Sequence, residues 1–264
     1  DFDQLVAQIH ARGMKLIMDL VINHTSDEHE WFQKALKEPD SKYGAYYLFR
    51  NEPNNWTSIF GGSAWNYYAE RNQYALHLFS KKQTDLNWEN PELRRDIIAM
   101  VRWWLEKGVD GFRMDVINFI SKREGLPNGN EKIGALMGTY GVEHYFYGPR
   151  LHEYLQQIKK EAFAPYGAFS VGETPGIGME MGKLLTADYR EELDMIFSFD
   201  HLRLRWKASA LSRSFWNTVR SLWAWSAFLT NCWGIVEPPC TALRCRTSWT
   251  NARATPRGST PSCS

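Results

Sequence analysis

Short apolar runs alternate along the chain with longer segments whose apolar residues recur at helical spacing. Runs rich in Val, Ile, Leu, Met and Phe predict strands, and a period of 3.6 residues predicts helices. The predicted strands cover residues 15–22, 109–116, 169–171 and 194–199, and the predicted helices cover residues 1–12, 90–108 and 150–163. Strands that alternate with helices in this way are typical of an α/β fold with a parallel sheet.

One predicted strand carries an arginine and a carboxylate among apolar residues. Side chains alternate between the two faces of a strand, so Arg113 and Asp115 share one face while the apolar residues, including Val116, share the other. The guanidinium favours the charged form of Asp115, which suits a nucleophile better than a proton donor. An isolated Arg-x-Asp pair is more often a structural ion pair at a strand end, so the pair alone does not establish a catalytic site.

Polar residues also follow the other predicted strands. Asn23 and His24 follow the strand at 15–22, and Glu173 follows the strand at 169–171. In barrels of parallel strands, the residues that carry the chemistry lie at the C-terminal strand ends. The pattern therefore predicts that these side chains meet at one rim of the sheet.

Two long segments interrupt the alternation of strands and helices. Residues 42–88 consist of short stretches rich in Asn, Gly, Tyr and Trp, and residues 117–148 form a glycine-rich segment directly after the Arg-x-Asp strand. Long insertions on such a scaffold usually carry function. We predict a small inserted subdomain over residues 42–88 and a substrate-facing loop over residues 117–148.

Composition narrows the classes of function. The net charge is +1 over 264 residues, which gives no electrostatic case for binding nucleic acid or an anionic membrane. No apolar run approaches the roughly 18 residues of a membrane-spanning helix. All four cysteines lie beyond residue 231, so the body of the chain has no disulfide framework and no cysteine metal cluster. This usage is typical of a reducing compartment, and we expect a cytoplasmic bacterial protein.

Four ordered segments carry a family resemblance. They are DLVINH at 19–24, QTDLNW at 83–88, GFRMDVI at 111–117 and VGET at 171–174. Together they resemble signature regions of the α-amylase superfamily of glycoside hydrolases, family 13, and are most similar to its oligo-1,6-glucosidase and α-glucosidase branch. The resemblance covers roughly residues 1–204. It implies an α/β fold that is a partial (β/α)8 TIM barrel, with a small subdomain inserted after the third barrel strand and an aberrant C-terminal tail.

The resemblance also implies a division of the chain into four parts. Residues 1–41 would hold the second helix and third strand of the barrel, residues 42–88 the inserted subdomain B, residues 89–204 strands four to six, and residues 205–264 a divergent or frame-shifted tail. Two barrel strands would precede Asp1, so we expect an N-terminal truncation.

The implied activity is retaining hydrolysis of α-glucosidic bonds at the non-reducing end of short oligosaccharides. Asp115 would attack the anomeric carbon to form a covalent glucosyl-enzyme, and Glu173 would act first as acid and then as base. Retaining enzymes hold these carboxyl groups about 5–5.5 Å apart. We expect neighbouring carboxylates and partial burial to raise the pKa of Glu173.

The resemblance assigns supporting roles to four more residues. His24 would bind the sugar in the subsite of the cleaved unit, Asp19 and Asn23 would order the arginine and the adjoining loop, and Val116 would favour α-1,6 bonds over α-1,4 bonds. The partner is an oligosaccharide, no cofactor or catalytic metal is required, and the intact enzyme would be a monomer. A structural calcium is compatible with the family, but its loop would precede Asp1.

Two other functions share these motifs. A sucrose isomerase or transglucosidase of the same superfamily would carry a similar set of residues. Non-catalytic superfamily members act as structural partners, although they typically lose the catalytic carboxylates that stand here at Asp115 and Glu173.

The C-terminal part departs from the family pattern. Residues 228–231 begin like the family's F-x-x-N-H-D motif, but Cys232 and Trp233 stand where His and Asp belong. A reading-frame error in the coding sequence explains this best, and a genuinely divergent tail is the alternative. The family's third carboxylate has no counterpart, so we expect the 264-residue polypeptide to be inactive and poorly soluble by itself.

Overall fold

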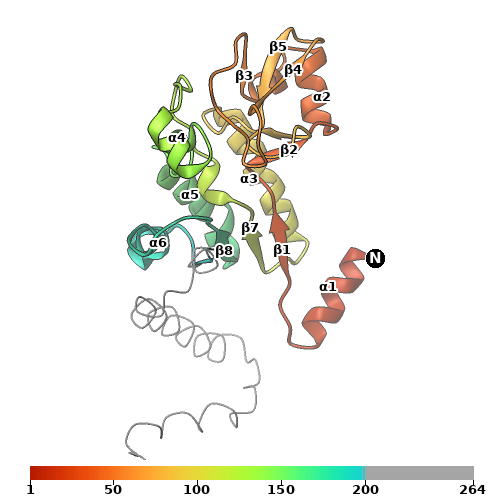
Figure 1. Cartoon of the computed structure of the whole chain (residues 1–264). Helices are drawn as coiled ribbons and strands as arrows, with labels where there is room; N and C mark the ends of the chain where they lie inside the picture. Colours follow the sequence, from red (N-terminus) through yellow and green to blue (C-terminus); the bar gives the residue numbers. More distant parts are fainter. Residues whose placement is uncertain (198, 200–264) are drawn as a thin grey trace, which may run out of the picture. The chain divides into compact units, whose positions relative to one another are not determined.

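The computed structural model describes residues 1–197 and residue 199 (Figure 1). Its centre is a four-stranded parallel sheet in the order β1-β7-β8-β9. These strands are β1 (Ile17–Leu20), β7 (Gly111–Met114), β8 (Phe169–Glu173) and β9 (Met195–Phe197). The α/β fold with a parallel sheet that the sequence predicts is therefore confirmed. The tail over residues 205–264 lies outside the described residues.

The predicted helices are also present, with shifted ends. They are α1 (Phe2–Ala11), α3 (Pro91–Glu106) and α5 (Leu151–Ile158), the last of which continues as a π-helical segment over Lys159–Phe163. Asn90 caps α3, because its side-chain oxygen accepts hydrogen bonds from the backbone N–H groups of Glu92 and Leu93. A further helix, α6 (Met179–Thr186), precedes β9.

The strand predicted over residues 109–116 ends sooner than its apolar pattern suggests. The last strand residue is Met114, and Val116 has left-handed backbone angles of φ 37° and ψ 42°. A β-branched residue rarely adopts this conformation, and nothing in a period-two pattern reveals it. The alternation predicts that Val116 lies on a strand face. Val116 lies instead in the turn that follows Asp115.

Residues 42–88 form small antiparallel sheets rather than part of the parallel sheet. Strands β3 (Phe49–Arg50), β5 (Gln73–Leu76) and β4 (Trp65–Tyr68) make one sheet, and β2 (His24–Ser26) pairs with β6 (Gln83–Asp85). Helix α2 (Glu30–Lys37) lies between β2 and β3 in the chain and was not predicted. Its apolar residues at 31, 32, 35 and 36 are the signal that would have found it.

The sequence predicts a loop over residues 117–148, but this segment also contains a helix. It contains α4 (Glu131–Met137), which begins at the side-chain cap of Asn130 and ends at Gly138 with φ 75°. Short 3-10 turns complete the described chain at Lys42–Ala45, Ile117–Phe119, Val142–His144, Ala164–Tyr166 and Asp188–Arg190. Helix α4 is seven residues long, too short for helical periodicity to stand out in a glycine-rich stretch.

Two hydrophobic clusters hold these parts together. The larger packs the sheet against α3 and α5, with Phe112, Val101 and Leu155 among its buried residues. The smaller includes Trp56 of the inserted segment and Tyr145 of the segment after Asp115. It therefore attaches the inserted sheets to the residues that follow the β7 strand end.

A glycine permits the close approach of the two central strands. A Cβ atom on Gly111 would lie 2.3 Å from the backbone oxygen of Phe169, a distance that real side chains do not reach. The register of β7 and β8, and with it the placement of their C-terminal ends, depends on this glycine.

Candidate active site

Asp115 and Glu173 lie at the C-terminal ends of two neighbouring parallel strands. β7 pairs with β8 through Met114 and Gly172, so the residue after each of these is carried to the same edge of the sheet. Both carboxylates contact one guanidinium: Arg113 Nη1 donates to Asp115 Oδ1 at 2.7 Å, and Arg113 Nη2 contacts Glu173 Oε2. The structure thus brings together the two residues to which the sequence assigned the chemistry.

A third carboxylate contacts the same arginine. Arg113 Nη1 also donates to Asp19 Oδ1 at 2.7 Å, from the adjacent strand β1. Burial alone would lower the pKa of Arg113, but the hydrogen bonds with Asp19 and Asp115 outweigh it and leave that pKa above its ordinary value. We call Asp19, Arg113, Asp115 and Glu173 the arginine-centred cluster. It holds three carboxylates from three strands around one permanent cation.

This arrangement suits chemistry that needs an ordered, charged carboxylate. Arg113 donates to one oxygen of Asp115 and fixes it, which leaves the other oxygen to approach an electrophile. Glu173 supplies a second carboxyl group on the neighbouring strand end. The Asp115 side chain is partly exposed at this edge of the sheet, whereas Glu173 is buried beside Arg113.

Val116 does not join the arginine-centred cluster. Its side chain is buried in the smaller hydrophobic cluster, which also contains Trp56, Leu78 and Tyr145. Any influence of Val116 on a ligand therefore acts through packing and through the backbone turn after Asp115.

His24 lies in β2, between the sheet and the inserted strands, and is buried. Its Nδ1 atom is 3.2 Å from the side-chain nitrogen of Asn23, and its Nε2 atom is 3.0 Å from the side-chain nitrogen of Gln83. Burial lowers the pKa of His24, and the negative charges of Asp85 and Asp115 partly oppose this effect. The imidazole is thus neutral at pH 7 and lies within the electrostatic range of Asp115.

The sequence analysis missed Lys122, which is buried beside His24. Its Nζ atom forms an ion pair with Asp85 Oδ2 at 2.8 Å and donates to Asn23 Oδ1 at 2.9 Å. Asn23 in turn donates to Asp85 Oδ2 at 3.0 Å, and Asp85 Oδ1 accepts from the backbone N–H of Leu78. Burial lowers the pKa of Lys122, and Asp85 opposes this shift.

We call Asn23, Asp85 and Lys122 the buried lysine network. It joins the end of β1, the closing strand of the inserted segment and the segment after Asp115. A single lysine inside the otherwise uncharged run 116–122 was the signal in the sequence. Asp85 holds this lysine on one side and the backbone of Leu78 on the other.

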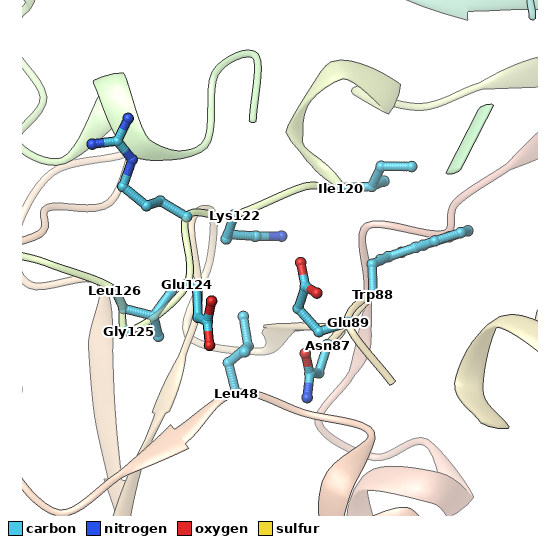
Figure 2. Close-up of a pocket in the computed structure, with 10 residues that line it drawn as sticks. Leu48, Asn87, Trp88, Glu89, Ile120, Lys122, Glu124, Gly125 and Leu126 are labelled. Carbon is cyan, nitrogen blue, oxygen red and sulfur yellow. The ribbon is translucent and has the colours of Figure 1, made fainter. Parts of the chain in front are cut away.

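A cavity of about 220 Å³ lies beside the network (Figure 2). It is lined by residues from three segments of the chain: Leu48, Asn87, Trp88, Glu89, Ile120, Lys122, Arg123, Glu124, Gly125 and Leu126. No member of the arginine-centred cluster lines it. This cavity is therefore separate from the candidate active site, although Lys122 borders both the cavity and the network around His24.

The described residues offer neither a cluster of metal ligands nor a membrane-spanning helix. Over residues 1–197 and 199, no group of three or more His, Cys, Asp or Glu side chains is placed to hold a metal ion. Within the same part of the chain, no helix is long and apolar enough to cross a bilayer. The structural calcium that the family resemblance allows stays a prediction.

Comparison with known proteins adds a family match and named relatives. Residues 1–234 match the family model for the α-amylase catalytic domain. An oligo-1,6-glucosidase of Halalkalibacterium halodurans is 51% identical over 209 residues, which cover 77% of this chain and 37% of that protein. The chain therefore spans little more than a third of the length of this relative.

Solved structures show the same partial likeness. A trehalose-6-phosphate hydrolase of Bacillus licheniformis superimposes with a TM-score of 0.72 at 42% identity, over 76% of this chain and 36% of that one. A trehalulose synthase superimposes with a TM-score of 0.72 at 42% identity, over 76% of this chain and 37% of that one. About three quarters of this chain thus superimposes on roughly a third of each of these solved enzymes.

Proposed function

Because the chain belongs to the family of α-amylase catalytic domains, we propose that it carries the nucleophile and the acid/base residue of a retaining α-glucosidase. The substrate would be a short oligosaccharide with a glucose at its non-reducing end. The observation that supports this most directly is the shared guanidinium of Arg113, which Asp115 and Glu173 contact from neighbouring strand ends. The names of the relatives, among them oligo-1,6-glucosidases, support the same substrate class.

The proposed first step forms a covalent glucosyl-enzyme. Asp115 attacks the anomeric carbon as the glycosidic bond breaks, and Glu173 gives its proton to the departing oxygen. In the second step Glu173 takes a proton from water, the water oxygen attacks the same carbon, and Asp115 leaves. Two inversions return an α-configured glucose.

Arg113 has a separate role for each carboxylate in this scheme. It donates to one oxygen of Asp115 and so orients the carboxylate for attack through the other oxygen. Its contact with Glu173 places a cation beside the proposed acid/base residue. We propose that a sugar bound between them separates Glu173 from Arg113, so that Glu173 can hold the proton that the first step consumes.

The proposal extends to the architecture. The four parallel strands would be the third to sixth strands of a (β/α)8 barrel, with residues 42–88 as the inserted subdomain B and residues 89–204 as the returning barrel. The position of both carboxylates at C-terminal strand ends supports this assignment, because barrel enzymes place their chemistry there.

A chimera tests the catalytic assignment. Residues 1–204 would replace the corresponding segment of the oligo-1,6-glucosidase of Halalkalibacterium halodurans, which supplies the rest of the enzyme. We expect hydrolysis of isomaltose with α-glucose as the first product. Asp115→Asn and Glu173→Gln should each lower kcat by about 10³-fold or more, whereas Asp3→Asn, on the exposed start of α1, should not. A folded Asp115→Asn chimera that retains substantial turnover would show that Asp115 is not the nucleophile.

Preference for α-1,6 bonds is the finer part of the proposal. Val116 supports it, since valine after the nucleophile is typical of α-1,6-acting members of the family. The ratio of kcat/KM for isomaltose to that for maltose should fall in a Val116→Thr chimera, because the hydroxyl alters the packing that sets the turn after Asp115. An unchanged ratio would show that Val116 does not set the preference for α-1,6 bonds.

A sucrose isomerase is the second candidate, and the likeness to a trehalulose synthase favours keeping it. The two functions differ in what accepts the glucosyl group. Incubation of the chimera with sucrose should release glucose and fructose if the enzyme is a hydrolase. Formation of an isomer of sucrose as the main product would favour the isomerase.

A further inference from the structure

We propose that Lys122 is a positioning residue that acts through Asn23 to hold neutral His24 in the tautomer with its proton on Nε2. This N–H would then be offered to an oxygen of the bound sugar. The inference rests on the proposed function only for the identity of the ligand. The tautomer itself follows from the donors and acceptors around the ring.

The buried lysine network fixes the orientation of the Asn23 amide. An ammonium group can only donate hydrogen bonds, and Lys122 Nζ lies 2.9 Å from Asn23 Oδ1. A carboxylate can only accept them, and Asp85 Oδ2 lies 3.0 Å from Asn23 Nδ2. Rotating the amide by half a turn would set donor against donor and acceptor against acceptor. The network therefore assigns the amide orientation from both sides.

The fixed amide presents a donor to the imidazole. Asn23 Nδ2 carries two hydrogens: one goes to Asp85, and the other faces His24 Nδ1 at 3.2 Å. Nδ1 can accept that hydrogen bond only if it carries no proton. A neutral imidazole then has its proton on Nε2, and the lowered pKa of His24 agrees with a neutral ring.

Gln83 opposes this assignment on the other side of the ring. Its Nε2 atom lies 3.0 Å from His24 Nε2, and its Oε1 atom accepts from the backbone N–H of Ser80. Two N–H groups would therefore face one another in the proposed tautomer. Either the Asn23 amide or the Gln83 amide must therefore change its orientation. The amide with the weaker other hydrogen bonds is the one that changes.

Asn23 is held more firmly than Gln83. Its amide bonds to two ionised and buried groups, Lys122 and Asp85, whereas Gln83 is held by one neutral backbone N–H and is partly exposed. Hydrogen bonds to ionised groups are roughly twice as strong as neutral ones. Gln83 is therefore the residue that yields. If its amide turns, Oε1 faces His24 Nε2–H as an acceptor, and if the side chain withdraws, that N–H has no acceptor among the described residues. An oxygen of a ligand can take that place.

Nitrogen NMR of the full 264-residue chain tests the tautomer without requiring catalysis. Long-range proton–nitrogen correlations of the ¹⁵N-labelled protein, with the His24 signals assigned by a His24→Gln variant, distinguish a protonated from an unprotonated ring nitrogen. We expect an unprotonated Nδ1 and a protonated Nε2. A wild-type spectrum with the proton on Nδ1 would overturn the proposal.

Variants test the dependence on Lys122. Lys122→Met should convert the single tautomer into an exchange-averaged mixture, whereas Lys132→Met, the same change at an exposed lysine of α4, should not. A folded Lys122→Met chain with the wild-type ring signals would show that Lys122 does not position His24.

A second substitution keeps the test decisive if Lys122→Met fails to fold. Asn23→Asp replaces the donor that faces Nδ1 with an acceptor, and it should move the proton from Nε2 to Nδ1. Circular dichroism of each variant checks that its fold is retained. Ring signals of a folded Asn23→Asp chain that match the wild type would also refute the relay. These results are independent of isomaltose hydrolysis, so the relay and the proposed function can fail separately.

Discussion

The arginine-centred cluster and the buried lysine network are built from the same chemical groups in different surroundings. The side chains of Arg113 and Asp19 are 30% and 58% exposed, whereas those of Lys122 and Asp85 are 4% and 0% exposed. The first set of charges lies at strand ends, where a ligand can reach it. The second is buried, and its lysine borders a cavity rather than open solvent. Burial thus separates charges that are available for chemistry from charges that fix neighbouring side chains.

The carboxylates of the arginine-centred cluster and of the buried lysine network should also respond differently to loss of the cation. Removing a cation that is open to water leaves carboxylates that water can solvate. Removing a buried cation leaves an uncompensated buried charge, which costs far more. Substitution of each cation should therefore separate an effect on stability from an effect on activity.

The largest effect on stability is expected at the buried cation. Lys122→Met should lower the free energy of unfolding by about 3–5 kcal/mol, because it leaves the Asp85 carboxylate buried without its ion pair. Urea unfolding followed by circular dichroism measures this change, and Lys132→Met is the matched control. A loss below about 1 kcal/mol would place the lysine network in the same class as a surface ion pair.

Substitution of the partly exposed cation should affect activity more than stability. Arg113→Met should lower the free energy of unfolding by only about 1–2 kcal/mol, since water reaches Asp19 and screens the loss. In the chimera it should lower isomaltose hydrolysis by about 100-fold or more, because Asp115 loses the charge that orders it. Arg95→Met, at an exposed ion pair of α3, is the control. Equal losses of stability at Arg113 and Lys122 would contradict the comparison.

Acid should destabilise the protein through its buried histidines. Burial lowers the pKa values of His24 and His77 below their ordinary 6.5. The unfolded chain then binds protons that the folded chain does not, so the free energy of unfolding falls as pH drops below about 6.5. The slope is at most about 1.4 kcal/mol per pH unit for each proton.

A histidine variant separates this effect from general acid denaturation. His24→Gln should have a shallower fall of stability between pH 7 and pH 5, measured by urea unfolding at each pH. At pH 8 both histidines are neutral in the folded and the unfolded chain, so the variant should not change the slope there. An unchanged slope below pH 6.5 would show that His24 does not contribute.

The smallest expected effect is that of salt. Raising NaCl from 0.05 to 0.5 M should reduce the difference in unfolding free energy between the wild type and Arg113→Met by less than about 1 kcal/mol, because ions screen partly exposed charges. The corresponding difference for Lys122→Met should not change, since ions do not reach a buried pair. If salt changed the differences for Arg113→Met and Lys122→Met equally, Lys122 would be no better shielded from ions than Arg113.

Several local features could be read from residue order alone. The apolar runs located all four parallel strands, and the Asn-Pro start located α3. The Arg-x-Asp spacing and the glutamate at the end of β8 identified the residues that the fold brings together. These predictions succeeded because strand alternation, helix capping and strand-end position depend on residues close in sequence.

Other features depended on residues far apart in the chain. The left-handed turn at Val116 is held by packing against the inserted segment, and no local pattern predicts it. Lys122 lies 37 residues from Asp85 and 99 from Asn23, so only the folded chain could show their contact. The contact of Arg113 with Glu173 was missed for the same reason, because β7 and β8 meet only in the sheet.

The amino-acid sequence by itself determined the order of the parallel strands and of helices α1, α3 and α5, the family, and which carboxylates end the two central strands. Short-range periodicity and motif order carry that information. Tertiary structure alone decided that one arginine serves three carboxylates and that a buried lysine stands behind His24. Burial and the pairing of charges are properties of space around a side chain, and that space forms only when distant segments pack together.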